Sequence, residues 1–311
     1  MKPISPWSSQ ALRLRESARR ETRAETTPTE PRDGGSGART RTELRRLTEA
    51  IEQLPSIPIV AHRVGELAHD PQQDARSIAE VMKGDPALTA KVLRIVNSPY
   101  YAIPGGVTDV ARAISFLGFS ALQQLVLTVS VFDTLDVRST RGRLLFRHCV
   151  AAAAASEAIA QIVGHPSPHE CFTAGLLHDL GHLAILQVDH DEDPETHAVS
   201  QATHEMVGDK LATKWRFPVA LRAAIGAHHC PTESGEQFAK PQRVLIDVTA
   251  LADTISRRSG YGTHDEETPK LPTDVLHRLN LTHLVEERTH DRMRWNLERT
   301  EVLFRVLMGE G

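Results

Sequence analysis

The stretch DPALTAKVLRIVNSP, residues 85–99, contains the start, the period and the end of an amphipathic α-helix. Asp85 is a good N-cap residue, and Pro86 suits the first helical turn. The apolar side chains that follow recur three or four residues apart, at Leu88, Val92, Leu93 and Val96. Asn97, Ser98 and Pro99 end the pattern. The stretch therefore predicts a helix with one buried face.

The same period extends along the chain in both directions from this helix. Helices are predicted at about 44–54, 60–69, from 74, 110–117, 121–135, 143–163, 170–187, 196–215, 218–229 and 241–258. Pro- and Gly-containing turn signals separate several of them, as at His165–Pro168 and Pro231–Gly235. No stretch alternates convincingly with a period of two. The predicted fold class is all-α.

The amino-terminal residues differ in composition from the rest of the chain. Residues 1–46 carry 11 Lys+Arg and 6 Asp+Glu, a net charge of +5, so the remaining residues carry 25 against 34, a net charge of −9. Residues 26–42, TTPTEPRDGGSGARTRT, show no apolar periodicity and cannot bury enough surface to order themselves. We therefore expect a disordered basic arm at 1–40. A solvated tail is favoured over an arm that binds nucleic acid, so nucleic acid is not the expected partner.

The carboxyl-terminal residues 259–311 are predicted to extend the main globule. Residues 263–269 are a polar loop, and two or three helices are expected after it, at about 273–279, 281–288 and 292–307. About fifty residues make a poor independent core, so we expect these helices to pack on the preceding domain.

Composition limits the class of protein. A 311-residue chain with 40% hydrophobic residues can bury a substantial core. No continuous apolar run approaches the roughly 20 residues that span a bilayer, and the first residues are too polar for a secretory signal. Three cysteines without a C-x-x-C pair favour a reducing compartment. The expectation is a cytoplasmic protein without a membrane partner, in which Cys149 and Cys230 are buried, inert thiols.

Histidine is the unusual component, with 16 residues, ten of which lie between His148 and His229. Imidazole and carboxylate groups suit Zn, Mn and Fe, and on neighbouring helices they could form a binuclear site. An adjacent pair on a helix points about 100° apart, so both members could reach a metal or a metal pair. A single histidine on a helix is more often a hydrogen-bonded core residue. The ordered series is the stronger signal: His148, His178, Asp179, His204, His228, His229 and Asp253.

Five motifs give the chain a family resemblance. They are LPSIPIVAHRV at 54–64, DPALTAKVLRIVNSPYY at 85–101, AISFLGFSALQQLVL at 113–127, GLLHDLGHLAIL at 175–186 and HEMVGDKLATKWRFP at 204–218. Over about 44–258 the chain resembles the HDOD (HD-related output domain) branch of the HD superfamily of metal-dependent phosphohydrolases, with an HD-type half at about 143–258. The resemblance implies an all-helical globule in a bacterial signalling protein whose partners are other signalling proteins.

The resemblance also implies a metal site. His148, His178, Asp179 and Asp253 match the ligands of HD enzymes. His204, His228 and His229 match the additional ligands of the HD-GYP branch, which hydrolyses cyclic di-GMP, and there Asp179 would bridge two divalent ions of Fe, Mn or Zn. The chain departs from that branch at His182, where a lysine is usual, and at CPTESGEQF, where a Gly-Tyr-Pro signature is usual. These departures leave cyclic di-GMP unsupported as the substrate.

Two functions remain open at this point. In the first, two ions activate a water that attacks phosphorus in a phosphate ester, phosphodiester or nucleotide, with Asp179 and His182 as catalytic residues. His182, one helical turn after His178, would donate a proton or hold the substrate, or would be only a core or supporting histidine. In the second, the protein is a non-catalytic interaction module whose histidines are relics or hold a structural metal.

Overall fold

The structure is a computed structural model, and it describes residues 49, 51–68, 74–98, 101–188, 194–231, 238–262, 268–282, 285–294 and 305. For residues 194–203 the description covers the backbone alone. The chain divides into two units, Met1–Arg41 and Thr42–Gly311, and all the described residues belong to the second. The expected basic arm at 1–40 lies outside the described residues, as does most of the helix expected at 44–54.

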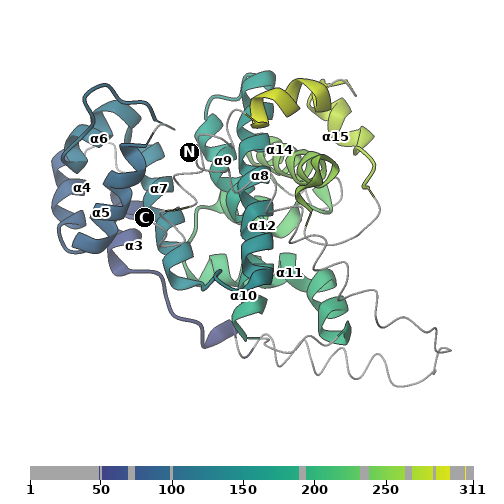
Figure 1. Cartoon of the computed structure of the whole chain (residues 1–311), viewed down its shortest axis with the longest axis horizontal. Helices are drawn as coiled ribbons and strands as arrows, with labels where there is room; N and C mark the ends of the chain where they lie inside the picture. The colour runs from purple at the N-terminus through teal and green to yellow at the C-terminus, as the bar shows by residue number, and fades with distance from the viewer. Residues whose placement is uncertain are drawn as a thin grey trace, which may run out of the picture. The chain divides into compact units, whose positions relative to one another are not determined.

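The described residues form helices joined by turns (Figure 1). The first group is α3 (Ile59–Ala68), α4 (Ala75–Met82), α5 (Pro86–Val96), α6 (Val110–Leu117) and α7 (Phe119–Thr134). The second is α8 (Thr140–Val163), α9 (Pro168–Leu177), α10 (Leu180–Val188), α11 (Pro194–Lys214), α12 (Val219–Ala227), α14 (Lys240–Ser256), the π-helix η1 (Arg257–Tyr261) and α15 (Thr273–Arg278). No strand occurs in the described part of the chain, and the predicted all-α class is confirmed.

Aspartate caps begin three helices of the first group, and the cap predicted at Asp85 is one of them. The carboxylates of Asp74, Asp85 and Asp109 each accept a hydrogen bond from the backbone N–H three residues later. Each bond pairs one of the N–H groups that a helix start leaves without a partner, and replacing such a cap by alanine costs about 1 kcal/mol. The helices then bury the apolar face that the periodicity indicates.

Helix α8 forms the centre of the second group and packs against both α9 and α14. Its Ala151–Ala155 run is fully buried, and these small side chains let α9 approach closely. A Cβ on Gly175 of α9 would overlap Ser156 Oγ and lie 2.7 Å from the carbonyl oxygen of Ala152. The close contact brings the carboxyl end of α9 next to α8, where the candidate ligands lie.

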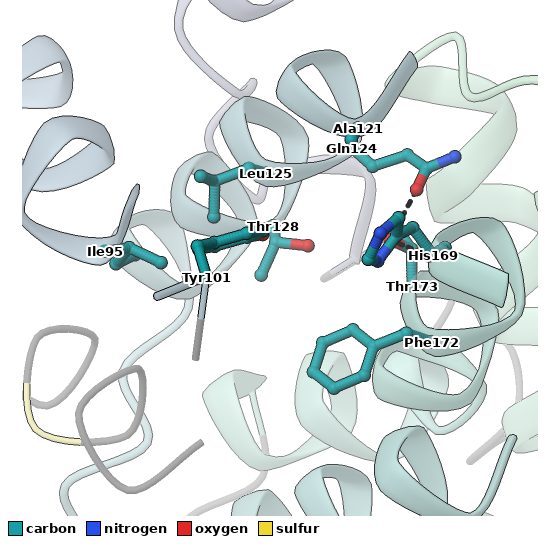
Figure 2. A pocket seen from close by; sticks show the side chains of 9 residues that line it. All are labelled: Ile95, Tyr101, Ala121, Gln124, Leu125, Thr128, His169, Phe172 and Thr173. Atoms are coloured by element: carbon teal, nitrogen blue, oxygen red, sulfur yellow. Dashed lines mark hydrogen bonds between the residues drawn. The ribbon is translucent and has the colours of Figure 1, made fainter. Parts of the chain in front are cut away.

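Several contacts connect the two groups of helices. Helix α7 packs on α9, and a cavity of about 20 Å³ remains between them, large enough for a single water (Figure 2). Thr173 Oγ1 donates to Gln124 Oε1 across this junction at 3.3 Å. At the end of α11, Lys214 Nζ donates to the carbonyl oxygens of Glu52 and Leu54, each at 2.7 Å.

The structure corrects two helix predictions. The single helix expected at 170–187 is interrupted at His178 and Asp179, between α9 and α10. The helices expected at 281–288 and 292–307 are not separate, because residues 285–294 form one helical run, with no Pro or Gly between 288 and 292 to end it. Much of 295–307 lies outside the described residues.

One stretch meets the length and composition of a membrane span, although no unbroken apolar run reaches that length. The 21-residue stretch Pro168–Val188, across α9 and α10, is long and apolar enough to qualify, and 78% of its apolar window is buried inside the protein. The bent pair α6 and α7, with 119° between the helices, qualifies together. Histidines and Asp179 interrupt Pro168–Val188, so it contains no unbroken apolar run of that length. Its burial is that of a core helix.

Candidate metal centre

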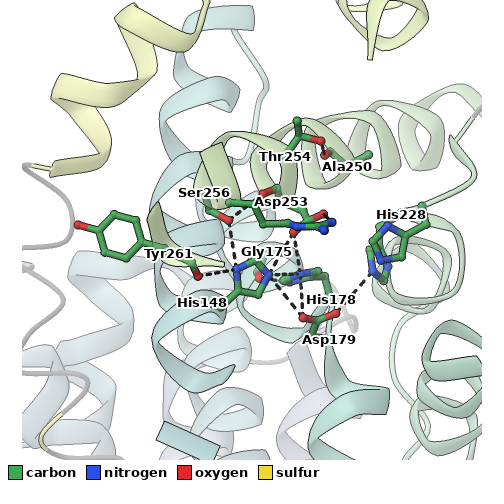
Figure 3. Close-up of polar contacts among 12 residues, drawn as sticks. His148, Gly175, His178, Asp179, His228, Ala250, Asp253, Thr254, Ser256 and Tyr261 are labelled. Atoms are coloured by element: carbon green, nitrogen blue, oxygen red, sulfur yellow. Dashed lines mark hydrogen bonds and ion pairs between the residues drawn. The ribbon is translucent and has the colours of Figure 1, made fainter. Parts of the chain in front are cut away.

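The seven predicted ligand residues come together from five parts of the fold. Helix α8 contributes His148, the α9–α10 interruption contributes His178 and Asp179, α11 contributes His204, the end of α12 contributes His228 and His229, and α14 contributes Asp253. His229 is exposed, whereas each of the other six is no more than 5% exposed. Figure 3 shows Asp179 with His148 and His178 on one side and His228 on the other.

Four of these residues form what we call the first group: His148, His178, Asp179 and Asp253. His148 Nε2 lies 3.2 Å from His178 Nε2 and 3.1 Å from Asp253 Oδ1. Asp179 Oδ2 lies 3.5 Å from both of these imidazole nitrogens. Ligand bonds of about 2.0–2.2 Å place neighbouring ligand atoms about 3.0–3.5 Å apart. Four separations in the first group fall in this range, and the distance from His178 Nε2 to Asp253 Oδ1 is longer, at 3.8 Å, so the group is close to the geometry that one ion requires.

The second group is Asp179, His204, His228 and His229. The other carboxylate oxygen of Asp179, Oδ1, lies 3.8 Å from His204 Nε2 and 3.7 Å from His228 Nε2. His204 Nε2 and His228 Nε2 are 3.4 Å apart, and ligand atoms of His204, His228 and His229 all lie within 4.8 Å of one another. Asp179 thus directs one oxygen to each group.

Backbone carbonyls orient three of the imidazole rings. The Nδ1 atoms of His148, His178 and His228 lie 3.2, 2.7 and 2.9 Å from the carbonyl oxygens of Tyr261, Gly175 and Ile225. A carbonyl oxygen only accepts, so each Nδ1 carries the proton and the Nε2 of the neutral ring is left with a lone pair. All three Nε2 atoms point into the cluster. Such fixing of the tautomer is characteristic of metal-binding histidines.

The same hydrogen bonds account for the interrupted helix. In a continuous helix the Gly175 carbonyl would accept from the N–H of Asp179, but it accepts from the His178 ring. The end of α12 repeats this arrangement. There the Ile225 carbonyl accepts from the His228 ring, and the N–H of His229 donates to Glu205 Oε1 at 3.0 Å. Both adjacent ligand pairs therefore lie where a helix stops, and not within a helix as the sequence suggested.

Charge in the cluster keeps the carboxylates ionised. Burial alone would raise the pKa of Asp179, but His178, His228 and other nearby imidazoles hold it well below its usual range. The pKa of Asp253 is lowered in the same way, chiefly by His148. Burial lowers the pKa of His178 to about 4, so its ring is neutral near pH 7. The cluster therefore offers anionic oxygens and a neutral imidazole, the forms in which these groups bind metal.

Close backbone approach makes the second group possible. A Cβ on Gly181 of α10 would overlap the carbonyl oxygen of His204 and lie 2.6 Å from its carbonyl carbon. A Cβ on Gly208 of α11 would lie 2.6 Å from Ile225 Cγ2. Nothing in the local sequence marks Gly181 for this role, although it lies only two residues after Asp179.

The chain matches a known protein family. The HDOD domain model matches residues 54–231, more than half of the chain. The chain belongs to the HDOD family. The resemblance stated from the motifs is confirmed, and the match includes six of the seven predicted ligands. Asp253 lies beyond its end.

Curated relatives of this HDOD protein share parts of the sequence. An uncharacterized protein of Treponema pallidum is 21% identical over 240 residues, which is 72% of this chain and 46% of that protein. Ribonuclease Y of Clostridium kluyveri is 30% identical over 128 residues, 41% of this chain and 21% of the enzyme. The chain therefore spans less than half the length of these relatives.

Solved structures share the HDOD fold. An HDOD domain protein of unknown function from Geobacter sulfurreducens is 22% identical, with 86% of this chain and 97% of that chain covered and a TM-score of 0.58. A protein of Shewanella amazonensis, provisionally assigned as a metal-dependent phosphohydrolase, is 17% identical, with 85% and 99% covered and a TM-score of 0.62. Identities this low show the fold alone.

The structure also places His182, the predicted catalytic histidine. Its ring stacks on that of His204, with centroids 4.0 Å apart and 11° between the planes. One ligand atom each of Asp179, His182 and His204 lies within 4.8 Å of the others. His182 is half-buried and therefore lies beside the second group. Its catalytic role stays a prediction, as do the ligand roles of the seven residues.

Several site residues were missed in the sequence. Ser256 lies at the end of α14, and its Oγ is 3.3 Å from His148 Nδ1. Tyr261 lies in η1, and its carbonyl oxygen contacts the same nitrogen. Arg257 Nη1 lies 3.6 Å from Asp253 Oδ2. Of these three residues, only Arg257 could have been identified from the sequence, because it follows Asp253 by four residues, the spacing of an ion pair on a helix. Of the two thiols expected to be buried, Cys149 is buried, but Cys230 is exposed because α12 has already ended before it.

Proposed function

We propose that this HDOD protein is a metal-dependent phosphohydrolase whose centre holds two divalent ions of Fe, Mn or Zn. The proposal rests on the way in which the two oxygens of the Asp179 carboxylate face different sets of histidines. Oδ2 lies 3.5 Å from the first-group imidazoles, and Oδ1 lies 3.7 Å from His228 Nε2. A carboxylate between two sets of histidines is the arrangement expected of a bridging ligand.

The residues present fit two such ions. The first group offers two imidazoles and two carboxylates, and the second offers three imidazoles and a carboxylate oxygen. This mixture of nitrogen and oxygen donors suits Zn, Mn and Fe. The orientation of the rings by backbone carbonyls supports metal binding over a set of ordinary core histidines, because it directs a lone pair from each ring to one place.

Bound ions would supply a nucleophile from water near neutral pH and neutralise charge on the phosphate oxygens. Asp179 would fix the spacing between the two groups. His182 lies beside the second group and is half-buried, so it can exchange protons with solvent and donate one to the leaving oxygen. The exposed His229 marks the side of the second group that is open to solvent.

The proposed substrate is a phosphate ester or phosphodiester, including nucleotides. The relative named Ribonuclease Y, 30% identical over 128 residues, is by its name an enzyme that acts on RNA, which is a phosphodiester. That relation supports including a short RNA among the substrates tested, although nucleic acid was not the expected partner.

The experiment is a hydrolysis assay on protein loaded with Mn²⁺, Fe²⁺ or Zn²⁺. The panel is an aryl phosphate, an aryl phosphodiester, mononucleotides, cyclic dinucleotides and a short RNA. We expect turnover of at least one, and its loss in Asp179→Ala. Turnover that persists in Asp179→Ala would place the activity elsewhere. A metal-loaded protein that hydrolyses none of the panel would contradict the proposal.

A second candidate function is a non-catalytic output module that acts on other signalling proteins. The burial of six of the seven ligand residues favours it, because a closed cluster suits a structural metal as well as a catalytic one. His182, in place of the lysine usual in the HD-GYP branch, favours it too. In that case the protein would bind metal without turnover, and Asp179→Ala would change its binding to a partner.

A further inference from the structure

A second cavity lies away from the metal centre, where α3 and α7 face the turn that joins α11 to α12. Its volume is about 170 Å³, and Leu127 and Phe217 contribute to apolar walls. The polar groups that line it are His62, Glu66, Gln123 and Arg216. An apolar cavity of about 150 Å³ in a protein can hold a benzene molecule, so this one has room for a ligand of that size. None of the seven metal-centre residues lines it.

Arg216 occupies an unfavourable backbone position in this lining. It ends α11 in a Schellman motif, in which the Arg216 N–H donates to the Thr213 carbonyl at 3.0 Å and the Phe217 N–H donates to the Ala212 carbonyl at 2.8 Å. The motif requires the left-handed conformation, and φ of Arg216 is 55°. Glycine is the usual residue at such a position because a Cβ is strained there.

Two other helix ends in this protein use the residues that the motif prefers. Gly164 ends α8 with φ 69°, and Asn280 follows α15 with φ 54°. Each is followed by the same long hydrogen bond, from His165 N to Ala160 O and from Leu281 N to Leu276 O, both at 2.8 Å. A position that glycine or asparagine would fill without strain is thus filled by arginine. Residues held in an unfavourable backbone conformation are concentrated at functional sites such as ligand clamps. The Arg216 guanidinium is therefore a candidate ligand-binding group.

That guanidinium is available for a ligand. Arg216 is exposed, and its side chain forms no ion pair or hydrogen bond with any residue that the structure describes. Glu66 lines the same cavity without forming an ion pair with Arg216. The His62 ring, half-buried in the lining, likewise has no hydrogen-bond partner in the described ranges. The cavity therefore presents a charged donor and an imidazole at the edge of an apolar space.

The neighbouring wall is fixed before any ligand arrives. Trp215, next to Arg216, is 1% exposed, and its Nε1 donates to the Pro55 carbonyl at 3.1 Å. Lys214 donates to two carbonyls of the same segment. A preformed wall lowers the entropy that a ligand must lose on binding.

We propose that this cavity binds a small carboxylate with an aromatic or branched apolar body of about the size of benzoate. The carboxylate pairs with the Arg216 guanidinium, which matches its planar, two-oxygen geometry. The apolar body packs against Leu127 and Phe217, and His62 donates to the remaining carboxylate lone pairs. This site is independent of the metal centre and of the hydrolysis proposed for it.

The test uses the 311-residue chain with Trp7→Phe and Trp295→Phe, which leaves Trp215, in the cavity wall, as its one tryptophan. Benzoate and its neutral analogue benzamide are titrated while the Trp215 fluorescence is followed. At ordinary ligand efficiency a molecule of this size binds with a dissociation constant of about 10 mM or lower. We expect benzoate to saturate in this range and to bind about tenfold more tightly than benzamide, because a charged hydrogen bond is lost in the amide.

The decisive variant is Arg216→Gly, which removes the guanidinium and suits the left-handed backbone better, so a loss of binding is not explained by unfolding. We expect the preference for benzoate over benzamide to disappear. Asn280→Gly makes the same kind of exchange at the end of α15 and should leave benzoate binding unchanged. The proposal is overturned if benzoate does not saturate, if the two ligands bind equally, or if Arg216→Gly keeps the preference.

Discussion

Gly181 and His204 lie so close that the structure has no space for a side chain between them. A Cβ on Gly181 would overlap the His204 carbonyl oxygen, and it would lie 2.9 Å from the backbone nitrogen of Gly208. Because α10 and α11 are in backbone contact here, His204 can approach the carboxylate of Asp179, the residue that precedes α10.

Gly181→Ala is therefore expected to separate α10 from α11. Backbone atoms cannot move aside as a flexible side chain can, so the variant should lose about 1–3 kcal/mol of unfolding free energy, or more. Urea denaturation measures this loss. Gly65→Ala in α3 is the control, because its Cβ would meet nothing closer than 3.6 Å. That substitution should be neutral or stabilising by up to about 1 kcal/mol. Equal stabilities for the two variants would contradict the argument.

Substitution of Asp179 and substitution of Asp253 should lower the number of bound metal ions by different amounts. Asp179 contacts both groups, whereas Asp253 Oδ1 lies 3.1 Å from His148 in the first group. Asp179→Asn should lower bound metal at both groups, and Asp253→Asn should lower it chiefly at the first. Metal analysis after loading and gel filtration measures the equivalents retained. The bridging role fails if Asp179→Asn keeps two equivalents.

The kink in η1 should affect the metal affinity of the first group through the orientation of the His148 ring. Gly260 has φ 88°, and the turn that it makes brings the Tyr261 carbonyl to His148 Nδ1. Gly260→Ala should weaken metal binding at the first group by about 10- to 100-fold, the usual effect of losing a contact that orients a ligand. Competition with a chromophoric chelator reports this affinity. Gly164→Ala is the control, because it carries the same kind of backbone strain, at φ 69°, with nothing within 4 Å of the added Cβ. It lies at the far end of α8 from the His148 ring and should bind metal normally.

Metal removal should destabilise the protein through the same residues. A ligand present at about 100 times its dissociation constant stabilises the folded state by about 2.7 kcal/mol per site. The melting temperature should therefore fall on treatment with a chelator, and Asp179→Asn should show a much smaller fall. A melting curve of the wild type that is unchanged by the chelator would mean that the folded state does not bind the ions tightly.

Local signals in the sequence were sufficient for most of the fold. Asp85 and Pro86 begin α5 as predicted, because an N-cap carboxylate acts within three residues of its own position. The ordered series of histidines and aspartates likewise consists of residues that the fold brings together. The cap acts within one helical turn, whereas the histidine and aspartate series is recognised from residue types and their order along the chain.

Features that depend on distant parts of the chain were not predictable in this way. The break at His178 depends on which ring nitrogen is protonated, and this in turn depends on what the other nitrogen faces. The contact of Tyr261 with His148 uses a backbone carbonyl, which every residue has, so no residue type marks it. The Gly181 contact requires a knowledge of which helix lies opposite.

The position of Asp253 on α14 affects how the protein can be divided. The family match ends at residue 231, but α14 supplies Asp253 and η1 supplies the carbonyl that orients His148. A fragment trimmed to the family boundary would retain His148, His178 and Asp179 and lose one of the two acidic groups that balance the charge of an ion there. Its metal preference and acidity would then be those of a different centre, so inactivity of such a fragment would carry no information about the 311-residue chain.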